Sequence, residues 1–155
     1  MTADRMDGYD RHILAVLSAN GRITWSDLAD EIGLSLTPTV RRVRMLEEAG
    51  YIRGYGARLD EARLAGTMVV FITVTLERQV RVALEDFEGE VAKLPEIMSG
   101  YLMSGSADYL LRAVVRGLDH YRDLLEALTR LPNVAHIQSS FALKSFVSRH
   151  SPIVD

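Results

Sequence analysis

The sequence predicts an α+β fold with two domains, an N-terminal winged helix-turn-helix and a C-terminal ferredoxin-like βαββαβ domain. Residues 1–59 hold three short helical patterns separated by turns, and an extended, glycine-containing stretch follows them. Residues 67–155 hold apolar, β-branched runs that alternate with helical patterns in the order β-α-β-β-α-β. Residues 60–66, DEARLAG, read as the linker between the two domains.

The composition is that of an ordinary globular chain and excludes several chemistries. Of the 155 residues, 48% are hydrophobic and 25% are charged, and the absence of cysteine excludes disulfides, thiol nucleophiles and cysteine-bound metals. No apolar run reaches the roughly 18 residues of a membrane span, and the first residues lack the apolar core of a signal peptide. We therefore expect a cytoplasmic protein with no membrane partner.

The first two helices are predicted from apolar spacing and capping residues. Residues 7–22 place apolar side chains at helical spacing and end at an Asn-Gly pair. The second helix follows Thr24, which resembles the start of a capping box with Asp27, and Gly33 is a natural end for it. Both helices are short, with a turn of a few residues between them.

The third helix completes a helix-turn-helix. Ser35 or Thr37 can cap its start, and Ala49-Gly50 closes it. Its connection to the second helix, GLS, has the length typical of this motif. The following stretch, YIRGYGARLD, reads as two extended pieces about Gly54 to Gly56, which predicts a small hairpin or wing.

The third helix has one apolar and one cationic face. At 100° per residue its apolar side chains gather toward the first two helices, at Leu36, Val40, Val43 and Leu46. Thr37 and Arg41 lie opposite, with Arg42 and Arg44 to either side. The bland interpretation is a solvated helix face with an Arg44–Glu48 ion pair. The helix-turn-helix spacing and the predicted wing favour DNA binding instead.

This cationic face has the chemistry of a recognition helix in a DNA major groove. Hydroxyls and backbone amides at its N-terminus can meet phosphate, and arginines can reach phosphate or guanine O6 and N7. Residues 1–59 carry eight basic and eight acidic side chains, so binding depends on local placement rather than on bulk charge. The predicted DNA-binding residues are Ser35, Thr37, Pro38, Thr39, Arg41, Arg42 and Arg44.

The second domain is predicted from alternating strand and helix patterns. TMVVFITVTL, residues 67–76, is a β-branched strand, and two further strands flank the loop Ser104–Ala107. Helical patterns over residues 82–94 and 118–131 each end before a proline, and a last strand follows. Two helices cover only one face of such a sheet.

The face of this sheet that the helices leave open predicts an oligomer. Alternate residues of the strand 67–76 form one apolar face, and Val69 and Phe71 begin the other. An uncovered apolar face usually marks an interface, so we expect a homodimer. The alternative is a partly exposed sheet with Thr73 and Thr75 toward water.

Long stretches of both domains resemble one family of regulators. DRHILAVLSANGRITWSDLADEIGLSLTPTVRRVRMLEEAGYIRGYGARLD resembles the DNA-binding domain of the Lrp/AsnC family, and LMSGSADYLLRAVV, LTRLPNV and SSFALK resemble that family's ferredoxin-like ligand-sensing (RAM) domain. The match runs from residue 7 to about residue 147. It implies a transcription regulator that senses an amino acid or a related small molecule and pairs through its sheet into dimers, in a family whose dimers often associate further into octamers. A symmetric dimer would present two recognition helices to a pseudo-palindromic operator in double-stranded DNA.

The resemblance also implies an effector site in the second domain. An amino acid needs an acceptor for its ammonium, which Asp108 can supply, and donors for its carboxylate, which backbone amides near Gly105 and serine hydroxyls can supply. The alternative is that Gly105 and Asp108 shape a tight turn and Tyr109 packs in the core. The effector-binding residues carried over are Leu102, Ser104, Gly105, Asp108, Tyr109, Ser139, Ser140 and Phe141.

Two other functions remain open. Sirohaem decarboxylases resemble this family in both domains and use histidines. This chain has His12, His120, His136 and His150, but nothing in the sequence brings these histidines together. Such an enzyme also has no need of exposed arginines on the third helix. An octameric architectural protein that wraps DNA shares every feature above, and only the ratio of specific to non-specific affinity separates it from a local regulator. No catalytic motif or metal-ligand spacing is found, so we expect no catalytic residue, no metal and no cofactor.

Overall fold

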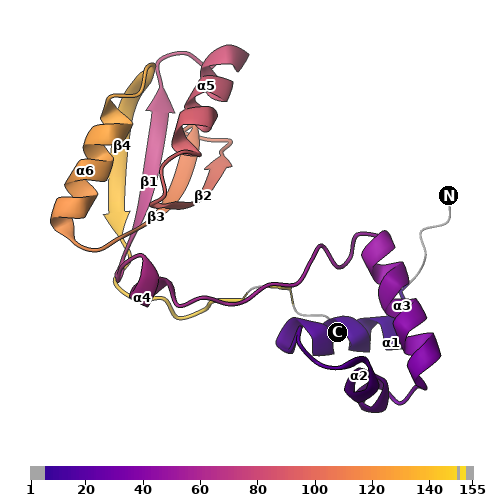
Figure 1. Cartoon of the computed structure of the whole chain (residues 1–155). Helices are drawn as coiled ribbons and strands as arrows, with labels where there is room; N and C mark the ends of the chain where they lie inside the picture. The colour runs from indigo at the N-terminus through magenta and orange to yellow at the C-terminus, as the bar shows by residue number, and fades with distance from the viewer. Residues whose placement is uncertain (1–5, 150, 153–155) are drawn as a thin grey trace. The chain divides into compact units, whose positions relative to one another are not determined.

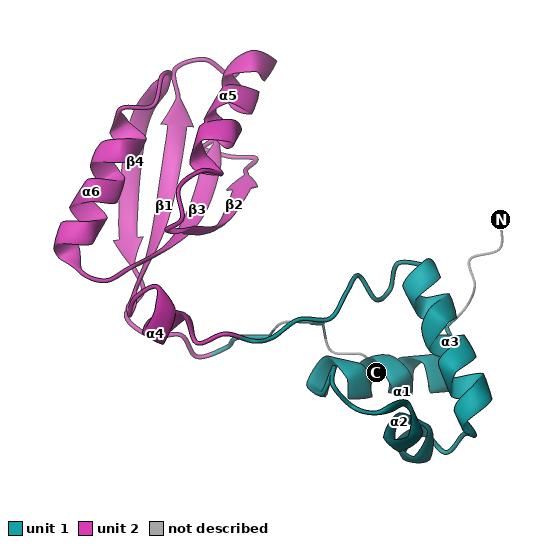
Figure 2. Ribbon diagram, viewed as in Figure 1, with its two compact units in different colours: residues 1–58, 147–155 teal, residues 59–146 magenta. Residues whose placement is uncertain are grey.

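The chain folds into two compact units. The computed structural model describes residues 6–149 and 151–152 (Figure 1). One unit contains the chain up to Arg58 together with the described tail residues from Val147, and the other contains Leu59–Phe146 (Figure 2). The residues expected to form a linker, 60–66, thus group with the second unit, and the tail groups with the first.

The first unit is a three-helix domain with the expected helix-turn-helix order. Asp7 and Asp10 form a capping box at the first helix, and the Thr24 hydroxyl accepts a hydrogen bond from the Asp27 amide at the second. Gly33, in the left-handed conformation at φ 72°, ends the second helix, as predicted. The helices are α1 (Gly8–Ala19), α2 (Trp25–Ile32) and α3 (Leu36–Glu48).

The buried stripe of α3 differs from the predicted one in its N-terminal half. Val43 and Leu46 are buried as expected, but the third member of the stripe is Thr39, with 0% of its surface exposed. These residues are spaced i, i+4 and i+7, which is one face of a helix. Leu36 is the first residue of α3 and remains half exposed, so its predicted burial is wrong.

The segment after α3 is extended but forms no hairpin. Among the described residues, Ile52–Asp60 carry no strand, so the predicted pair of short strands is not formed. The segment is held to α3 instead, because the Tyr55 hydroxyl donates a hydrogen bond of 2.9 Å to Oε1 of Glu47.

The second unit has the predicted βαββαβ order, preceded by one short helix. Its four strands are antiparallel and follow the order β2-β3-β1-β4, so β1 and β3 are central and β2 and β4 are the edges. The elements are α4 (Glu61–Leu64), β1 (Met68–Leu76), α5 (Arg81–Val91), β2 (Ile97–Leu102), β3 (Tyr109–Val115), α6 (Leu118–Thr129) and β4 (Val134–Phe141).

Both long helices of this unit pack on one face of the sheet (Figure 1). The alternate residues of β1 that were predicted to share an apolar face are all buried, with Val70, Ile72 and Val74 at 0% exposure. They form one core with Phe87 of α5 and Leu128 of α6. Burial of an aliphatic or aromatic side chain of this size stabilises a fold by about 1.5–3 kcal/mol, so this face carries most of the stability of the unit.

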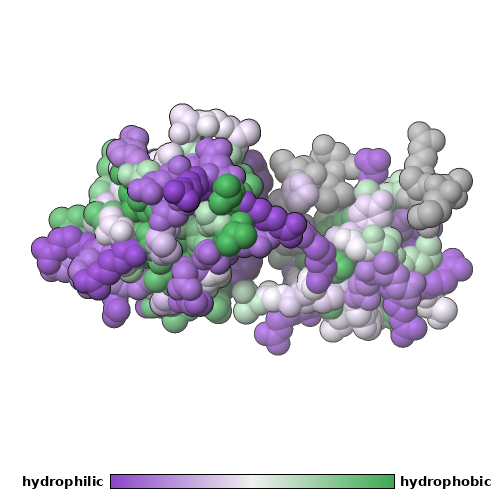
Figure 3. Space-filling view, turned by 90° about the horizontal axis from the view of Figure 1, so that it is seen from above, coloured by the Kyte–Doolittle hydropathy of each residue, from purple (hydrophilic) through white to green (hydrophobic). Residues whose placement is uncertain are grey.

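Among the described residues, no long helix of this unit covers the opposite face of the sheet. Phe71 points to this face and is 39% exposed, and the register places it between Arg112 of β3 and Ser140 of β4. Seen from above (Figure 3), the surfaces of both units mix hydrophilic and hydrophobic residues rather than separating them. None of the described helices is long and apolar enough to cross a membrane.

The expected linker is attached to the sheet. The Arg112 guanidinium forms two hydrogen bonds to the Glu61 carboxylate, with 3.2 Å between Nη1 and Oε1. Gly66 has a φ of 141°, and a Cβ added to it would lie 2.3 Å from the carbonyl oxygen of Val115. Only glycine allows so close an approach of the two backbones, so α4 and Gly66 are part of the second unit.

Candidate functional sites

The outer face of α3 carries two exposed arginines. Arg41 and Arg44 are exposed, and Thr37 lies on the same face one turn before Arg41. Within the described part of the chain, no ion pair joins either arginine, so the Arg44–Glu48 pair of the bland interpretation is not formed. We call Thr37, Arg41 and Arg44 the α3 basic face.

The N-terminal turn of α3 presents part of the predicted set. Ser35 occupies the N-cap position with extended backbone, and its side chain makes no capping hydrogen bond, so its hydroxyl is available to a ligand. Pro38 is half-buried. Thr39 is fully buried, and its hydroxyl donates to the Ser35 carbonyl at 2.9 Å. The assignment of Thr39 to the DNA surface is therefore wrong, because a core side chain cannot reach a duplex.

Arg42 is engaged within the unit. Its Nη1 lies 2.8 Å from Oδ2 of Asp7 and 2.7 Å from Oδ1 of Asp10, and its guanidinium lies 5.4 Å from the centre of the Tyr9 ring. The hydrogen bond to Asp10 raises the pKa of Arg42, so the guanidinium stays charged. We therefore correct its predicted role: Arg42 attaches α3 to α1, while Arg41 and Arg44 face outward.

The predicted effector residues lie in two separate groups. Leu102 is on the edge strand β2, whereas Ser139, Ser140 and Phe141 are on the opposite edge strand β4. Three interstrand spacings of about 4.8 Å separate these edges by about 14 Å. Within one chain the eight residues therefore do not form one pocket.

The loop between β2 and β3 holds Ser104 and Gly105 on the surface and Asp108 beneath it. Asp108 is 8% exposed, and its carboxylate accepts hydrogen bonds from the Leu76 amide and from Nε2 of Gln79, both at 2.7 Å. These bonds tie the start of β3 to the end of β1. These contacts are those of the turn-shaping role that was the alternative to ammonium binding.

The β4 group has one unusual atom. Ser139 pairs with Ile72 of β1 and so points toward the helix-covered face, where its hydroxyl is buried and has no hydrogen-bond partner among the described residues. Phe141 contacts the Tyr121 ring of α6 edge to face, with 5.0 Å between centroids. Ser140 is exposed on the other face. Unpaired buried hydroxyls are uncommon in folded proteins, and here the described chain supplies no partner for this one.

Tyr109 is in the core, as the structural alternative predicted, and it also lines a cavity. It is 3% exposed, its ring lies 4.6 Å from that of Phe87, and its hydroxyl donates a hydrogen bond of 2.9 Å to Oε1 of Glu88. Burial, and then the hydrogen bond and charge of Glu88, raise the pKa of the Tyr109 hydroxyl. Tyr109 therefore keeps its proton and acts as a donor.

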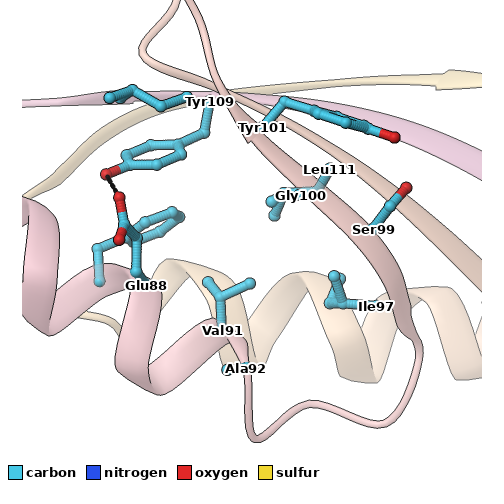
Figure 4. Close-up of a pocket in the computed structure, with 11 residues that line it drawn as sticks. Glu88, Val91, Ala92, Ile97, Ser99, Gly100, Tyr101, Tyr109 and Leu111 are labelled. Atoms are coloured by element: carbon cyan, nitrogen blue, oxygen red, sulfur yellow. Dashed lines mark hydrogen bonds between the residues drawn. The ribbon is translucent and has the colours of Figure 1, made fainter. Parts of the chain in front are cut away.

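The cavity lies between α5 and the edge strand β2 and has a volume of about 450 Å³ (Figure 4). Sequence reasoning found only Leu102 and Tyr109 of its lining. The remainder comes from α5, from β2 and from Leu111 of β3, which are distant in the sequence, and no motif marks them. The residues missed are Phe87, Glu88, Val91, Ala92, Ile97, Ser99, Gly100, Tyr101 and Leu111.

The described histidines are not gathered at one site. His120, in α6, accepts a hydrogen bond from the Arg116 amide at its Nδ1 and lies 2.9 Å from Glu96 through its Nε2. His136 pairs with Thr75 on the face of the sheet away from the helices, and His12 is exposed on α1. His150 lies outside the described residues. Among those residues, no group of histidine, aspartate or glutamate side chains could hold a metal ion.

A helix-turn-helix unit with an exposed basic face, joined to a ferredoxin-like unit with a cavity, defines a DNA-binding transcriptional regulator with a ligand-binding domain. The family model described as Lrp/AsnC ligand binding domain matches residues 69–152, and a winged helix-turn-helix DNA-binding model matches residues 6–53. The chain belongs to the Lrp/AsnC family of transcriptional regulators.

Curated relatives and solved structures agree with this assignment. The Bkd operon transcriptional regulator of Pseudomonas aeruginosa is 51% identical, over 95% of this chain and 97% of that protein. The leucine-responsive regulatory protein of Salmonella typhimurium is 44% identical, over 83% and 79% of the two chains. A transcriptional regulator from Neisseria meningitidis, solved in complex with L-methionine, has a TM-score of 0.89 and 36% identity, over 96% of each chain.

Proposed function

We propose that this regulator binds a pseudo-palindromic operator as a homodimer, with the α3 basic face in the major groove. The observation that carries the proposal is that Arg41 and Arg44 are exposed with no carboxylate partner in the described chain, whereas Arg42, between them, is fully engaged. Guanidinium groups left open in this way can pair with phosphate or with guanine. In a bacterial cell the chromosome lies in the cytoplasm, where we place the protein.

The open face of the sheet supports the dimer. Phe71 is 39% exposed at its centre, and Thr73 and Leu110 lie beside it on the same face at intermediate burial. Burial of this face against a second copy would relate two recognition helices by a two-fold axis, and binding two half-sites at once raises affinity through effective concentration. Dimers would then associate into octamers, as the family resemblance implies.

An amino acid is the effector that we propose. Support comes from the ligand-binding family model over the second unit and from the similar regulator solved with L-methionine. The relatives named as leucine-responsive point to the same class of molecule. The proposed role of this ligand-binding unit is therefore to regulate DNA binding, not to catalyse a reaction.

The experiment is a titration of DNA binding by fluorescence anisotropy, using the DNA upstream of the protein's own gene and a non-specific duplex, at two salt concentrations, with and without pooled amino acids. We expect specific DNA to bind more tightly than non-specific DNA, and one amino-acid pool to shift the titration. Equal affinity for both duplexes would indicate an architectural protein instead, and no binding to either would refute DNA recognition by α3.

Two variants test the α3 basic face directly. Arg41→Ala and Arg44→Ala should each weaken operator binding by about 1–3 kcal/mol if the contact is to a base, or lower the salt dependence by about one phosphate if it is to the backbone. Arg122→Ala, which removes an exposed arginine from α6, is the charge-matched control and should bind as wild type. Unchanged binding by both α3 variants would remove this face from the interface.

A further inference from the structure

The chain that joins the two units is attached at both of its ends. In the first unit, the Tyr55 hydroxyl donates a hydrogen bond of 2.9 Å to Glu47 of α3. In the second unit, the carboxylate of Glu61, the first residue of α4, accepts two hydrogen bonds from Arg112 of β3. Within the described residues, no backbone hydrogen bond involves residues 56–59. The free part of the joining chain is therefore confined to these residues.

α4 depends on its contact with Arg112. It has 4 residues, and isolated helices shorter than about 12 residues are marginal in water. Arg112 donates from Nη1 to Oε1 of Glu61 at 3.2 Å and from Nη2 to Oε2 at 2.5 Å. Two parallel hydrogen bonds from one guanidinium fix the geometry of a carboxylate as well as contributing energy. Arg112 therefore holds α4 on the sheet, and without it the next point of attachment is Gly66, whose backbone approaches that of Val115.

The Arg112–Glu61 pair sets the length of the joining chain. An extended chain spans at most about 20 Å from Tyr55 to Glu61, whereas it spans about 37 Å from Tyr55 to Gly66. Effective concentration falls roughly as the −3/2 power of tether length, or more steeply. Loss of the pair should therefore lower the preference of a dimer for two half-sites over one by about three- to sixfold.

We infer that Arg112 is a positioning residue for operator binding: through Glu61 it keeps the joining chain short, so that the two DNA-binding units of a dimer bind both half-sites at once. Arg112 acts from the sheet and makes no contact with DNA in this role. The inference rests on the proposed function, because it requires a dimer that binds two half-sites.

Fluorescence anisotropy of the full chain tests this role with two duplexes: the bound DNA upstream of the protein's own gene, and the same DNA truncated to a single half-site. Arg112→Met should lower the ratio of two-site to half-site affinity by about three- to sixfold, with half-site affinity unchanged. Glu61→Gln should do the same from the other side of the pair. Exchanging the two charges, with Glu61→Arg and Arg112→Glu in one chain, should restore the wild-type ratio, which a merely structural loss would not allow.

Two controls isolate the pair from the rest of the fold. Arg130→Met removes an exposed arginine that pairs with Glu126 one turn earlier on α6, and it should keep the wild-type ratio. Arg112 lies beside Phe71 on the open sheet face, so light scattering is used to check that each variant keeps the mass of the wild type. Glu61 is on α4 rather than on a strand, so Glu61→Gln removes the pair without changing the sheet face.

Trypsin digestion without DNA tests the attachment of α4 separately. Cleavage after Arg63, within α4, requires local opening and tracks the population of the open form. We expect Arg112→Met to be cut there several-fold faster than wild type or Arg130→Met, as measured by mass spectrometry of early fragments. Cleavage after Arg58, which lies in the free part of the joining chain, is the internal reference and should not change. Equal initial rates after Arg63 in Arg112→Met and wild type would overturn the inference.

The two proposals fail in different ways. A wild-type chain that binds both duplexes equally refutes two-site operator binding, and the positioning role with it. A wild-type chain that prefers two half-sites, with the same preference in Arg112→Met and Glu61→Gln, overturns this inference alone and leaves the proposed function intact.

Discussion

Arg41, Arg42 and Arg44 have the same chemistry and different surroundings. Asp7 and Asp10, at the start of α1, neutralise Arg42, and the ring of Tyr9 lies beside its guanidinium. Both aspartates also form the capping box of α1, so the same side chains begin one helix and position another. Within this cluster Arg42 is a structural residue, whereas Arg41 and Arg44 are exposed, and their carboxylate partners in the fold distinguish them.

Arg42→Met should lower the free energy of unfolding of the first unit by about 1 kcal/mol, since it removes two ion pairs of a partly exposed guanidinium and leaves two carboxylates close together. Trp25 is the single tryptophan and lies in this unit, so urea unfolding followed by its fluorescence measures the effect. Arg41→Met, at an exposed position, is the control and should unfold as wild type. A stability loss in Arg41→Met as large as in Arg42→Met would contradict the distinct roles.

Ionisation of Tyr55 lowers the free energy of unfolding of the first unit at alkaline pH. Burial, with the hydrogen bond to Glu47, raises the pKa of Tyr55 to about 12, above the value of about 10 for an unfolded chain. The folded state holds this proton longer, so the contribution is fully present below pH 10 and is lost as the pH rises toward 12. Tyr55→Phe should therefore show a smaller fall in stability between pH 9 and pH 11, again by Trp25 fluorescence. Parallel pH profiles for variant and wild type would exclude this role for Tyr55.

At the scale of elements, the sequence predicted what depends on local pattern. The three helices, the caps of the second helix at Thr24 and Gly33, and the βαββαβ order follow from local pattern, and the structure confirms them. Burial of Thr39 was missed because a threonine is apolar enough for a core when its hydroxyl bonds to the preceding turn. The pair Asp10–Arg42 joins residues 32 positions apart, and the cavity is assembled from three elements, so no local pattern could show either.

α4 and Gly66 attach the predicted linker, residues 60–66, to the sheet. Gly66→Ala should destabilise the second unit by about 1 kcal/mol or more, because its φ of 141° and the nearby carbonyl of Val115 exclude a side chain. Gly89→Ala is the matched control: it lies within α5, where an added Cβ would meet no atom within 4 Å, and helix propensity predicts a gain of about 0.5–1 kcal/mol. Thermal unfolding followed by circular dichroism compares them, and equal effects in the two variants would contradict the close approach.

At the scale of the whole molecule, the proposed dimer requires the open sheet face of one chain to pack on a second copy of the chain. Phe71→Glu places a carboxylate at the centre of the open sheet face, beside Arg112, whose guanidinium already pairs with Glu61, so pairing with a second copy would bury an additional charge. We expect this variant to be monomeric by size-exclusion chromatography with light scattering, and to bind a two-site operator only as well as it binds a single half-site.

Val82→Glu is the control for that variant. Val82 is 67% exposed on α5, on the helical side of the sheet, so the same change there should leave the oligomer intact. A Phe71→Glu variant that keeps the wild-type mass would show that the open face is not the interface.

The attachment of α4 to the sheet determines where the chain can be recombined. Since Glu61 bonds to Arg112 and Gly66 touches β3, the module that carries the cavity begins at Leu59. A hybrid that fuses a foreign DNA-binding module at Arg58 keeps these contacts, whereas a junction after Gly66 discards them. The junction at Arg58 is therefore the one to choose for joining this ligand-binding domain to a DNA-binding domain that recognises another promoter.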